Sequence, residues 1–273
     1  MSPGHVAPTA SEGTLARLAG ELAQAARTRV PTALLSQRYP ELTLEDAYRI
    51  QQISTGWRLR AGARVAGHKV GLTSAAMQQQ MGIDEPDSGV VLDHMVAASG
   101  SSLHASNFMN PRIETEIAFR LGRDLDGPCD LYTVRTAVAE VFLAFEILDT
   151  CFPGWNITLI DSIAANAACA GVITGSPVPF APAWDLADEQ ITATADGATV
   201  ATGQGRNILG NPLQPLVWLT RRLAEHGARL RAGDIVLAGS VHASIPLTAG
   251  THFRATCSHL PAIHLRVLPA ATA

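Results

Sequence analysis

The sequence predicts an α+β fold in which helices near the N-terminus precede a mixed β-roll or β-sandwich. Three observations favour it: helical apolar spacing marks the first 62 residues, short strand-like segments broken by glycine follow, and few helices separate those strands. A doubly wound parallel sheet would need a helix between successive strands, so we do not expect one. We expect the 273 residues to divide into an N-terminal tail and helical subdomain (1–62) and a second domain (63–273).

The N-terminal part is predicted to hold a tail and two helices. Residues 1–13 are rich in Pro, Gly, Ser, Thr and Ala, which is typical of a loose tail. From Thr14 onward, a helix is indicated by apolar residues at helical spacing, namely Leu15, Leu18, Leu22 and Ala26. A second helix is expected to start after Thr43, because Thr43 can act as N-cap and Asp46 can complete a capping box, ahead of an apolar stripe.

The second part is predicted to be mainly strands. Strand-like segments are expected at 65–72, a turn or loop at 85–89 and a strand at 113–121. A helix at 130–138 is expected to lead into an apolar segment at 141–148, and a hairpin at 191–201 to turn around Asp196 and Gly197. A helix capped by Asn211 should run from Pro212 to Gly227, with further strands at 235–238 and 263–267.

Composition narrows the class of function. Hydrophobic residues make up 47% and charged residues 16%, which is enough apolar material for a core. The net charge of −4 and the lack of a basic run argue against nucleic-acid binding. We expect no membrane span and no signal peptide, and the four scattered cysteines favour reduced thiols in a cytoplasm over disulfides or zinc. The sequence therefore predicts a cytoplasmic protein that acts on small molecules.

Two glutamates on one predicted strand are the most informative chemical feature. In an extended strand Glu114 and Glu116 project from the same face, about 6–7 Å apart at the backbone, while the alternate positions are apolar. Neighbouring like charges repel unless something positive lies between them, and a divalent cation can bridge them.

A third glutamate strengthens this interpretation. Glu146 lies in an almost wholly apolar segment, and a buried carboxylate must be paired, protonated or bound to a metal. Three carboxylates without His or Cys form an all-oxygen ligand set, which suits Mg²⁺ or Mn²⁺. From spacing alone a second interpretation stays open: Glu114 and Glu116 lie on a solvated strand face, and Glu146 pairs with an arginine such as Arg112.

Several motifs resemble one known family. They include GHKVGLTS (67–74), GIDEPD (82–87) and PRIETEIA (111–118), and the likeness continues in the same order through 144–147, 155–157, 161–167, 209–213 and 232–237. Together they resemble the 2-keto-4-pentenoate hydratase family, which includes 2-oxo-3-hexenedioate (4-oxalocrotonate) decarboxylases, within the fumarylacetoacetate hydrolase superfamily. The resemblance spans about residue 40 to the C-terminus.

The resemblance carries implications for the fold and for the metal site. It implies the superfamily's mixed β-roll core and commonly a homo-oligomer. It also implies that Glu114, Glu116 and Glu146 bind a catalytic Mg²⁺ or Mn²⁺.

It further implies roles for other residues. Lys69 and Asp87 become the candidate acid/base residues, although Lys69 alone would read as a surface charge and Asp87 as a turn residue. Arg112 is a second-tier candidate that steers a substrate carboxylate or neutralises the glutamates. Gly205 would lie near the substrate, or only in a tight turn; Asn166 is a candidate pocket amide, or a satisfied interior amide on an alanine-rich helix.

The implied activity is a divalent-metal-dependent hydro-lyase reaction. Water would add to a 2-hydroxy-2,4-dienoate, in the 2-oxo-4-enoate series, to give a 4-hydroxy-2-oxo acid, as in meta-cleavage degradation of aromatic compounds. The first alternative is a 2-oxo-3-hexenedioate-type decarboxylase that uses the same metal-stabilised dienolate. An acylpyruvate C–C hydrolase would need a water-activating histidine, and a non-catalytic binding subunit would not need the intact acidic set.

Overall fold

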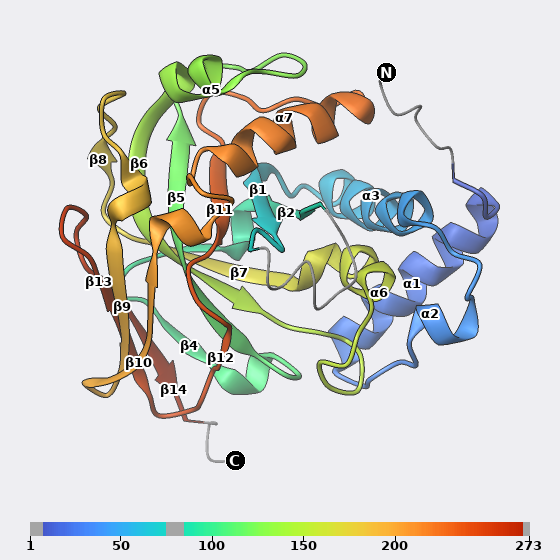
Figure 1. The fold of residues 1–273 in the computed structure, drawn as a ribbon. Coiled ribbons are helices and arrows are strands. Elements are labelled where there is room, and N and C mark those ends of the chain that lie inside the picture. The colour runs from blue at the N-terminus through green and yellow to red at the C-terminus, as the bar shows by residue number, and fades with distance from the viewer. Residues whose placement is uncertain (1–7, 75–84, 270–273) are drawn as a thin grey trace.

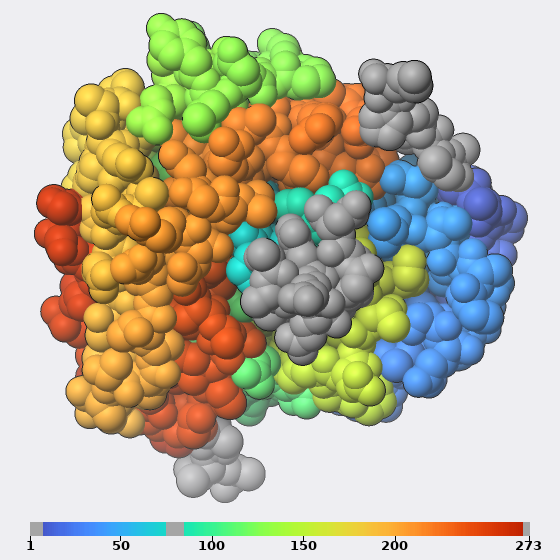
Figure 2. Space-filling view, in the orientation of Figure 1, coloured from blue at the N-terminus to red at the C-terminus, as the bar shows by residue number. Residues whose placement is uncertain are grey.

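The computed structural model describes residues 8–74 and 85–269, in which helices and two sheets alternate along the chain. The N-terminal helices lie on one side of the molecule and the five-stranded sheet lies on the opposite side (Figures 1 and 2). The predicted α+β class, mixed roll and N-terminal helices are confirmed. Residues 1–7 of the predicted tail and residues 82–84 of the second motif lie outside the described ranges.

Four helices form a helical layer with its own core. They are α1 (Glu12–Thr28), α2 (Leu35–Arg38), α3 (Leu44–Arg60) and α6 (Leu159–Ala164). The predicted capping box is confirmed, since Thr43 and Asp46 bond reciprocally at the start of α3. On α1 the buried alanines are Ala19 and Ala25, and Ala26, which we expected in the apolar stripe, is exposed. Because this core includes α6, it joins the N-terminal helices to a segment after residue 150. The domain boundary between residues 62 and 63 stays a prediction.

The larger sheet is a curled, mixed sheet of nine strands. Its strand order is β2 (Asp87–Leu92), β1 (Val65–Gly71), β11 (Ile235–Ser240), β5 (Arg112–Leu121), β6 (Val138–Leu148), β7 (Cys169–Thr174) and β3 (Val96–Ala98), with β12 (Ile245–Pro246) on β5 and β8 (Val178–Pro179) on β6. The β1–β11 and β3–β7 pairs are parallel and the others are antiparallel. Strand β2 therefore lies at one edge.

The second sheet has five strands, in the order β10 (Ala198–Gln204), β9 (Gln190–Ala195), β13 (His252–Thr256), β14 (Ile263–Leu268) and β4 (Ser102–His104). The predicted hairpin around Asp196 and Gly197 joins β9 to β10. The described loops also hold 3-10 turns, namely η1 (Asp93–Met95), η2 (Ala105–Asn107), η3 (Asn166–Ala168), η4 (Leu186–Asp188) and η5 (Gly205–Asn207). Among the described residues, none of the helices combines the length and apolar content that a bilayer span requires.

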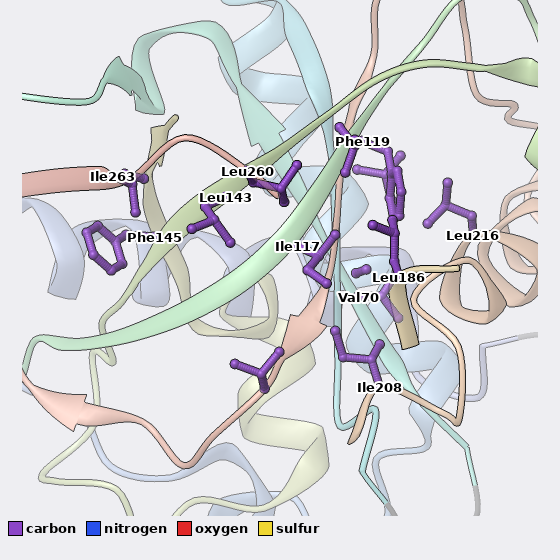
Figure 3. Close-up of a cluster of buried hydrophobic side chains, with 14 of the residues drawn as sticks. Val70, Ile117, Phe119, Leu143, Phe145, Leu186, Ile208, Leu216, Leu260 and Ile263 are labelled. Atoms are coloured by element: carbon purple, nitrogen blue, oxygen red, sulfur yellow. The ribbon is translucent and has the colours of Figure 1, made fainter. Parts of the chain in front are cut away.

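The two faces of β5 and β6 serve different purposes. Odd-numbered residues such as Ile117, Phe119 and Phe145 pack in the main apolar core, together with side chains from the second sheet and from α5 (Leu131–Ala137) and α7 (Gln214–Glu225) (Figure 3). Even-numbered residues, including Ala118 and Phe142, belong to a smaller cluster on the other face. Because side chains alternate along a strand, the three glutamates share the face of this smaller cluster.

Three local predictions are wrong. The segment 85–89 is not a turn throughout: Asp87, Ser88 and Gly89 belong to β2, because pairing with β1 overrides the local turn composition. The last helix starts at Gln214, and Asn211 instead accepts a hydrogen bond from Leu213 N–H in the preceding turn.

The third wrong prediction concerns Asn166, which lies in a 3-10 turn and not on a helix. Asn166, Ala167 and Ala168 have φ of 64°, 51° and 58°, so the chain makes a left-handed turn before β7. Left-handed backbone costs on the order of 1 kcal/mol per non-glycine residue, which the neighbouring contacts must offset.

Candidate functional site

Strand register brings the three glutamates together. In the β5–β6 ladder Glu114 lies directly opposite Glu146, and Glu116 follows two residues further on the same face of β5. One carboxylate oxygen from each of the three lies within 4.8 Å of the others. The strand periodicity, which the sequence predicts, places Glu114 and Glu116 on one face of β5. The register of β5 against β6, which the sequence does not predict, brings Glu146 to them.

The glutamates are withdrawn from solvent and incompletely paired. Glu116 is 0% exposed and Glu146 is 1% exposed, while Glu114 is half-buried. The Gly239 N–H donates to Glu116 Oε2 at 2.6 Å, but Oε1 of Glu116 and Oε1 of Glu146 accept no hydrogen bond within the described structure. The solvated-face interpretation is therefore wrong for Glu116, and Glu114 is only half exposed.

Burial and mutual repulsion make these carboxyl groups hard to ionise together. Burial, and then the charge of Glu146, raise the pKa of Glu114 to about 8. The same two causes raise the pKa of Glu116 well above its usual range, and burial also raises the pKa of Glu146. A divalent cation would remove this repulsion and occupy the unpaired oxygens, and an all-carboxylate set matches the ligand preference of Mg²⁺ and Mn²⁺. The residues present fit such an ion.

Lys69 and Asp87 lie beside the glutamates, on β1 and on the edge strand β2. Lys69 Nζ on β1 is 3.8 Å from Asp87 Oδ1 on β2 and 3.8 Å from Glu146 Oε1. Both residues are buried, at 4% and 2% exposure. Burial lowers the pKa of Lys69, but the charges of Glu146 and Asp87 outweigh burial and raise it, so the ammonium stays protonated. Lys69 is therefore not a surface charge, and Asp87 is not a turn residue.

Glycine makes room for this pair. Gly71 on β1 pairs with Asp87 on β2, and Lys69 projects from the same face of β1 as the α-carbon of Gly71. A Cβ at Gly71 would overlap Asp87 Oδ1 and would lie 2.8 Å from Lys69 Nζ. Only a residue without a side chain allows the two charged groups to meet above it.

Arg112 lies near the acidic group but is engaged elsewhere. Its charge lowers the pKa of Glu114, although this effect is small beside burial and Glu146. The guanidinium donates from Nε to Ser244 Oγ at 2.6 Å and from Nη2 to the Ser244 carbonyl, and it lies 6.0 Å from the Trp155 ring centroid. The suggested ion pair between Glu146 and an arginine is wrong, because the cation beside Glu146 is Lys69.

The other two candidates make main-chain contacts. The Asn166 side chain accepts from Val90 N–H at 2.8 Å and donates to the Val90 and Cys169 carbonyls, which is the satisfied interior amide that the sequence left open. A Cβ on Gly205 would overlap the Leu186 carbonyl, so close backbone packing explains this glycine. Neither residue makes a recorded contact with the described glutamates, Lys69 or Asp87.

Sequence reasoning missed several neighbours of the site. Ser162 Oγ lies 3.5 Å from Asp87 Oδ2, and the buried Cys169 thiol lies beside Glu146, whose pKa it lowers slightly against the effect of burial. Gly239, with φ of 109°, supplies the N–H to Glu116, and a Cβ there would overlap Thr73. Ser162 lies in one of the segments that resemble the family (161–167), but neither it nor Cys169 or Gly239 was singled out, because their contacts depend on tertiary placement.

The chain is similar to known proteins over most of its length. Residues 64–268 match the family model described as fumarylacetoacetate (FAA) hydrolase C-terminal. The chain is 38% identical over 237 residues to a 2-keto-4-pentenoate hydratase from Paraburkholderia xenovorans (strain LB400), covering 86% of this chain and 88% of that protein. It is 36% identical over 259 residues to a 2-oxo-hept-4-ene-1,7-dioate hydratase from Escherichia coli, covering 91% and 96%.

A solved structure is similar over nearly the whole chain. The 4-oxalocrotonate decarboxylase from Pseudomonas putida G7, complexed with magnesium and adipate, superposes with a TM-score of 0.92 at 28% identity, covering 95% of this chain and 99% of that one.

Proposed function

The chain belongs to the fumarylacetoacetate (FAA) hydrolase family, and from this premise we propose how its acidic site works. The chain is a hydro-lyase of the 2-keto-4-pentenoate hydratase type, which adds water to a 2-hydroxy-2,4-dienoate to give a 4-hydroxy-2-oxo acid. The observation that carries the proposal is the group of three buried glutamates with unpaired oxygens, beside a lysine–aspartate pair.

Glu114, Glu116 and Glu146 would hold a divalent cation, Mg²⁺ or Mn²⁺. When bound, such an ion supplies Lewis-acid stabilisation for charge on the 2-oxygen of an α-keto acid. Glu116 is oriented for this task by Gly239 N–H, which donates to its Oε2. This contact fixes the carboxylate before any ligand arrives, which lowers the cost of ordering it on binding.

Asp87 would transfer the protons, and Lys69 would stabilise the charge that develops. Hydration moves the dienol proton to the far end of the conjugated chain, and a water molecule then adds its oxygen at C4 and a proton at C3. Asp87 has an oxygen with no hydrogen-bond partner in the described structure, so it suits the role of base, and it returns the proton in the later step. Lys69 stays charged between Asp87 and Glu146, where it stabilises negative charge on the substrate.

The decarboxylase alternative rests on the overall likeness to the Pseudomonas putida G7 enzyme. It would use the same acidic group, but carbon dioxide would leave in place of water addition. Hydratases, at 34–38% identity, are the better supported reading. The acylpyruvate hydrolase alternative needs a histidine that faces the acidic group. His68 lies on the face of β1 opposite to Lys69, and His242 bonds Thr115 on the face of β5 opposite to the glutamates, so neither of these two histidines faces it.

A paired assay tests the proposal. Purified protein loaded with Mg²⁺ or Mn²⁺ is given 2-hydroxypenta-2,4-dienoate, or 2-oxohex-3-enedioate in a parallel reaction, and products are followed by NMR and by carbon dioxide release. We expect a 4-hydroxy-2-oxo acid from the monoacid and no carbon dioxide. Carbon dioxide without a hydroxylated product would identify a decarboxylase, and no turnover of either acid would contradict the catalytic role.

The homo-oligomer, the cytoplasmic location and the substrate tail stay predictions. One hydratase relative is named for a monoacid and another for a diacid, so both tail classes belong in the substrate panel. Size-exclusion chromatography with light scattering tests the oligomer, for which we expect a mass above that of one 28.8 kDa chain.

A further inference from the structure

Strand β2, which carries Asp87, is one of the edge strands of the nine-stranded sheet. On one side it pairs with β1. In an antiparallel ladder alternate residues direct their main-chain N–H and C=O away from the partner, so an edge strand leaves them unpaired. At β2 the outward residues are Ser88 and Val90, which flank Gly89 directly after Asp87.

Three side chains take the place of a neighbouring strand. Tyr48 Oη accepts from Ser88 N–H at 3.2 Å, and Gln51 Nε2 donates to the Ser88 carbonyl at 2.9 Å. Asn166 completes the edge by accepting from Val90 N–H and donating to the Val90 carbonyl at 3.0 Å. Both main-chain groups of each outward residue are thereby satisfied by side chains from outside the sheet.

Helix α3 supplies two of these contacts from adjacent turns. Tyr48 and Gln51 are three residues apart, so they lie on one face of the helix. Gln51 Nε2 also donates to the Ile163 carbonyl at 3.1 Å, which ties α3 to α6 as well as to β2. The Arg222 guanidinium lies 4.0 Å from the Tyr48 ring centroid and holds the ring in place. Both side chains are buried, so solvent cannot replace their hydrogen bonds.

The end of β2 that carries Asp87 has no apolar side chain, since the strand begins Asp-Ser-Gly, whereas Val91 and Leu92 at its other end are buried. A cavity of about 1140 Å³ is lined by Tyr48, Gln51, Ser88 and Val90, and a second cavity of about 290 Å³ is lined by Gln51, Val90 and Asn166. Polar contacts therefore set the position of the end of β2 that carries Asp87. A shift of this strand would carry Asp87 away from Lys69, which it faces at 3.8 Å.

We propose that Gln51 and Tyr48 are positioning residues, which fix Asp87 for proton transfer by holding both main-chain groups of Ser88. The inference rests on the proposed function, in which Asp87 is the base. It goes beyond that function because it assigns a catalytic requirement to helix α3, whose side chains make no recorded contact with the candidate metal ligands.

The test compares two neighbouring glutamines on the same helix. Gln51→Leu removes both donors while keeping the side-chain size. Gln52→Leu is the matched control, because Gln52 bonds only Arg49, at 3.4 Å, among the recorded contacts. For Gln51→Leu we expect kcat to fall about 10- to 100-fold, with the KM for the dienoate and the Mn²⁺ affinity within about threefold of the unmodified protein. Gln52→Leu should leave all three unchanged.

Tyr48→Phe keeps the ring under Arg222 and removes only the hydroxyl, so it serves if Gln51→Leu fails to fold. We expect kcat to fall about 3- to 10-fold, again without a matching change in KM. Crystal structures of both variants should show Asp87 further from Lys69. Unchanged kcat, or equal losses in kcat for the Gln51 and Gln52 variants, would overturn the proposal.

The structural readout separates this proposal from the proposed function. If the unmodified protein turns over no dienoate, the proposed function fails, whereas displacement of Asp87 in the Gln51→Leu crystal structure would still establish the positioning role. An undisplaced Asp87 would refute the positioning role even in an active enzyme.

Discussion

At the scale of single residues, the acidic group is a set of charges that the folded chain brings together at a cost. Glu114 and Glu146 face each other across two strands, where like charges destabilise the pair, and burial adds to that cost. A fold that keeps such an arrangement gains from it only when a cation is bound. The free energy of metal binding and the free energy of folding are therefore linked at this site.

Replacing one of these carboxylates should remove most of the metal affinity. In Glu146→Gln the side chain keeps its shape but loses its charge, so we expect Mn²⁺ affinity to fall about 100-fold or more, beyond the usual effect of losing an outer hydrogen-bond partner. Titration calorimetry measures this. Glu140→Gln is the control on the same strand, since Glu140 pairs with Arg120 and is partly exposed. Equal affinity in the Glu146 and Glu140 variants would contradict the ligand assignment.

A methyl group at Gly71 should impair turnover without unfolding the chain. Gly71 does not have a left-handed φ, so Gly71→Ala introduces no backbone strain, but its Cβ would displace Asp87 and Lys69. We expect kcat to fall about tenfold or more, because small misplacements of reacting groups are costly. Gly13→Ala on α1 meets no atom within 4 Å and should keep normal steady-state kinetics. Normal kcat in Gly71→Ala would remove the lysine–aspartate pair from the mechanism.

At the scale of elements, α3 connects the helical layer to the site, and its N-terminus is secured by one carboxylate. Asp46 is fully buried and accepts main-chain hydrogen bonds from Thr9, Ala10 and Thr43 at 2.8–2.9 Å, as well as hydrogen bonds from two threonine hydroxyls. The same Thr-x-x-Asp pattern begins α6, where Asp161 also bonds Ser36. Each aspartate thus caps a helix and fastens a second segment.

Asp46→Asn should destabilise the protein more than an ordinary cap substitution. The amide nitrogen cannot accept hydrogen bonds, so buried N–H groups lose their partner, and we expect the free energy of unfolding to fall by about 2–3 kcal/mol. Urea denaturation measures the change. Asp130→Asn at the N-cap of α5 is the comparison, because exposed Asp130 caps only Thr133 and Asn is also a good N-cap; we expect less than about 1 kcal/mol there. Equal losses would argue against the special role of Asp46.

Local patterns in the sequence predict what depends on neighbours along the chain. Period-two spacing put Glu114 and Glu116 on one face, and Thr43 with Asp46 marked the start of α3. Tertiary pairing decided the rest. Asp87 follows a proline in a segment of turn-like composition, yet β1 draws it into a strand. Gln51 looked like an ordinary polar position on a helix, because periodicity cannot reveal which main chain a side chain will meet.

At the scale of the whole molecule, stability should depend on pH through a buried histidine. Burial alone lowers the pKa of His68 from 6.5 to about 4. In that range the unfolded chain binds a proton that the folded chain does not, so stability is full above the unfolded pKa and falls as the pH drops towards the folded pKa.

The effect can be isolated by difference. Between about pH 7 and about pH 5, His68 should cost the protein about 2 kcal/mol of unfolding free energy. We therefore expect the stability advantage of the unmodified protein over His68→Gln to shrink by that amount in urea titrations. His94→Gln is the control, since the His94 side chain is 57% exposed. A gap that stays constant with pH for the His68 variant would contradict a neutral buried imidazole.

The candidate metal ligands and the candidate base, Asp87, lie on strands that are supported differently. Strands β5 and β6 are each paired with a strand on both sides, whereas Asp87 lies on β2, at one edge of the sheet. Local opening of a central strand requires more free energy than displacement of an edge strand. Substitutions near β2 can therefore change the placement of Asp87 without disturbing the strands that carry the glutamates. Mutant libraries that aim to convert water addition into carbon dioxide loss should vary residues of α3 and β2 and leave β5 and β6 unchanged.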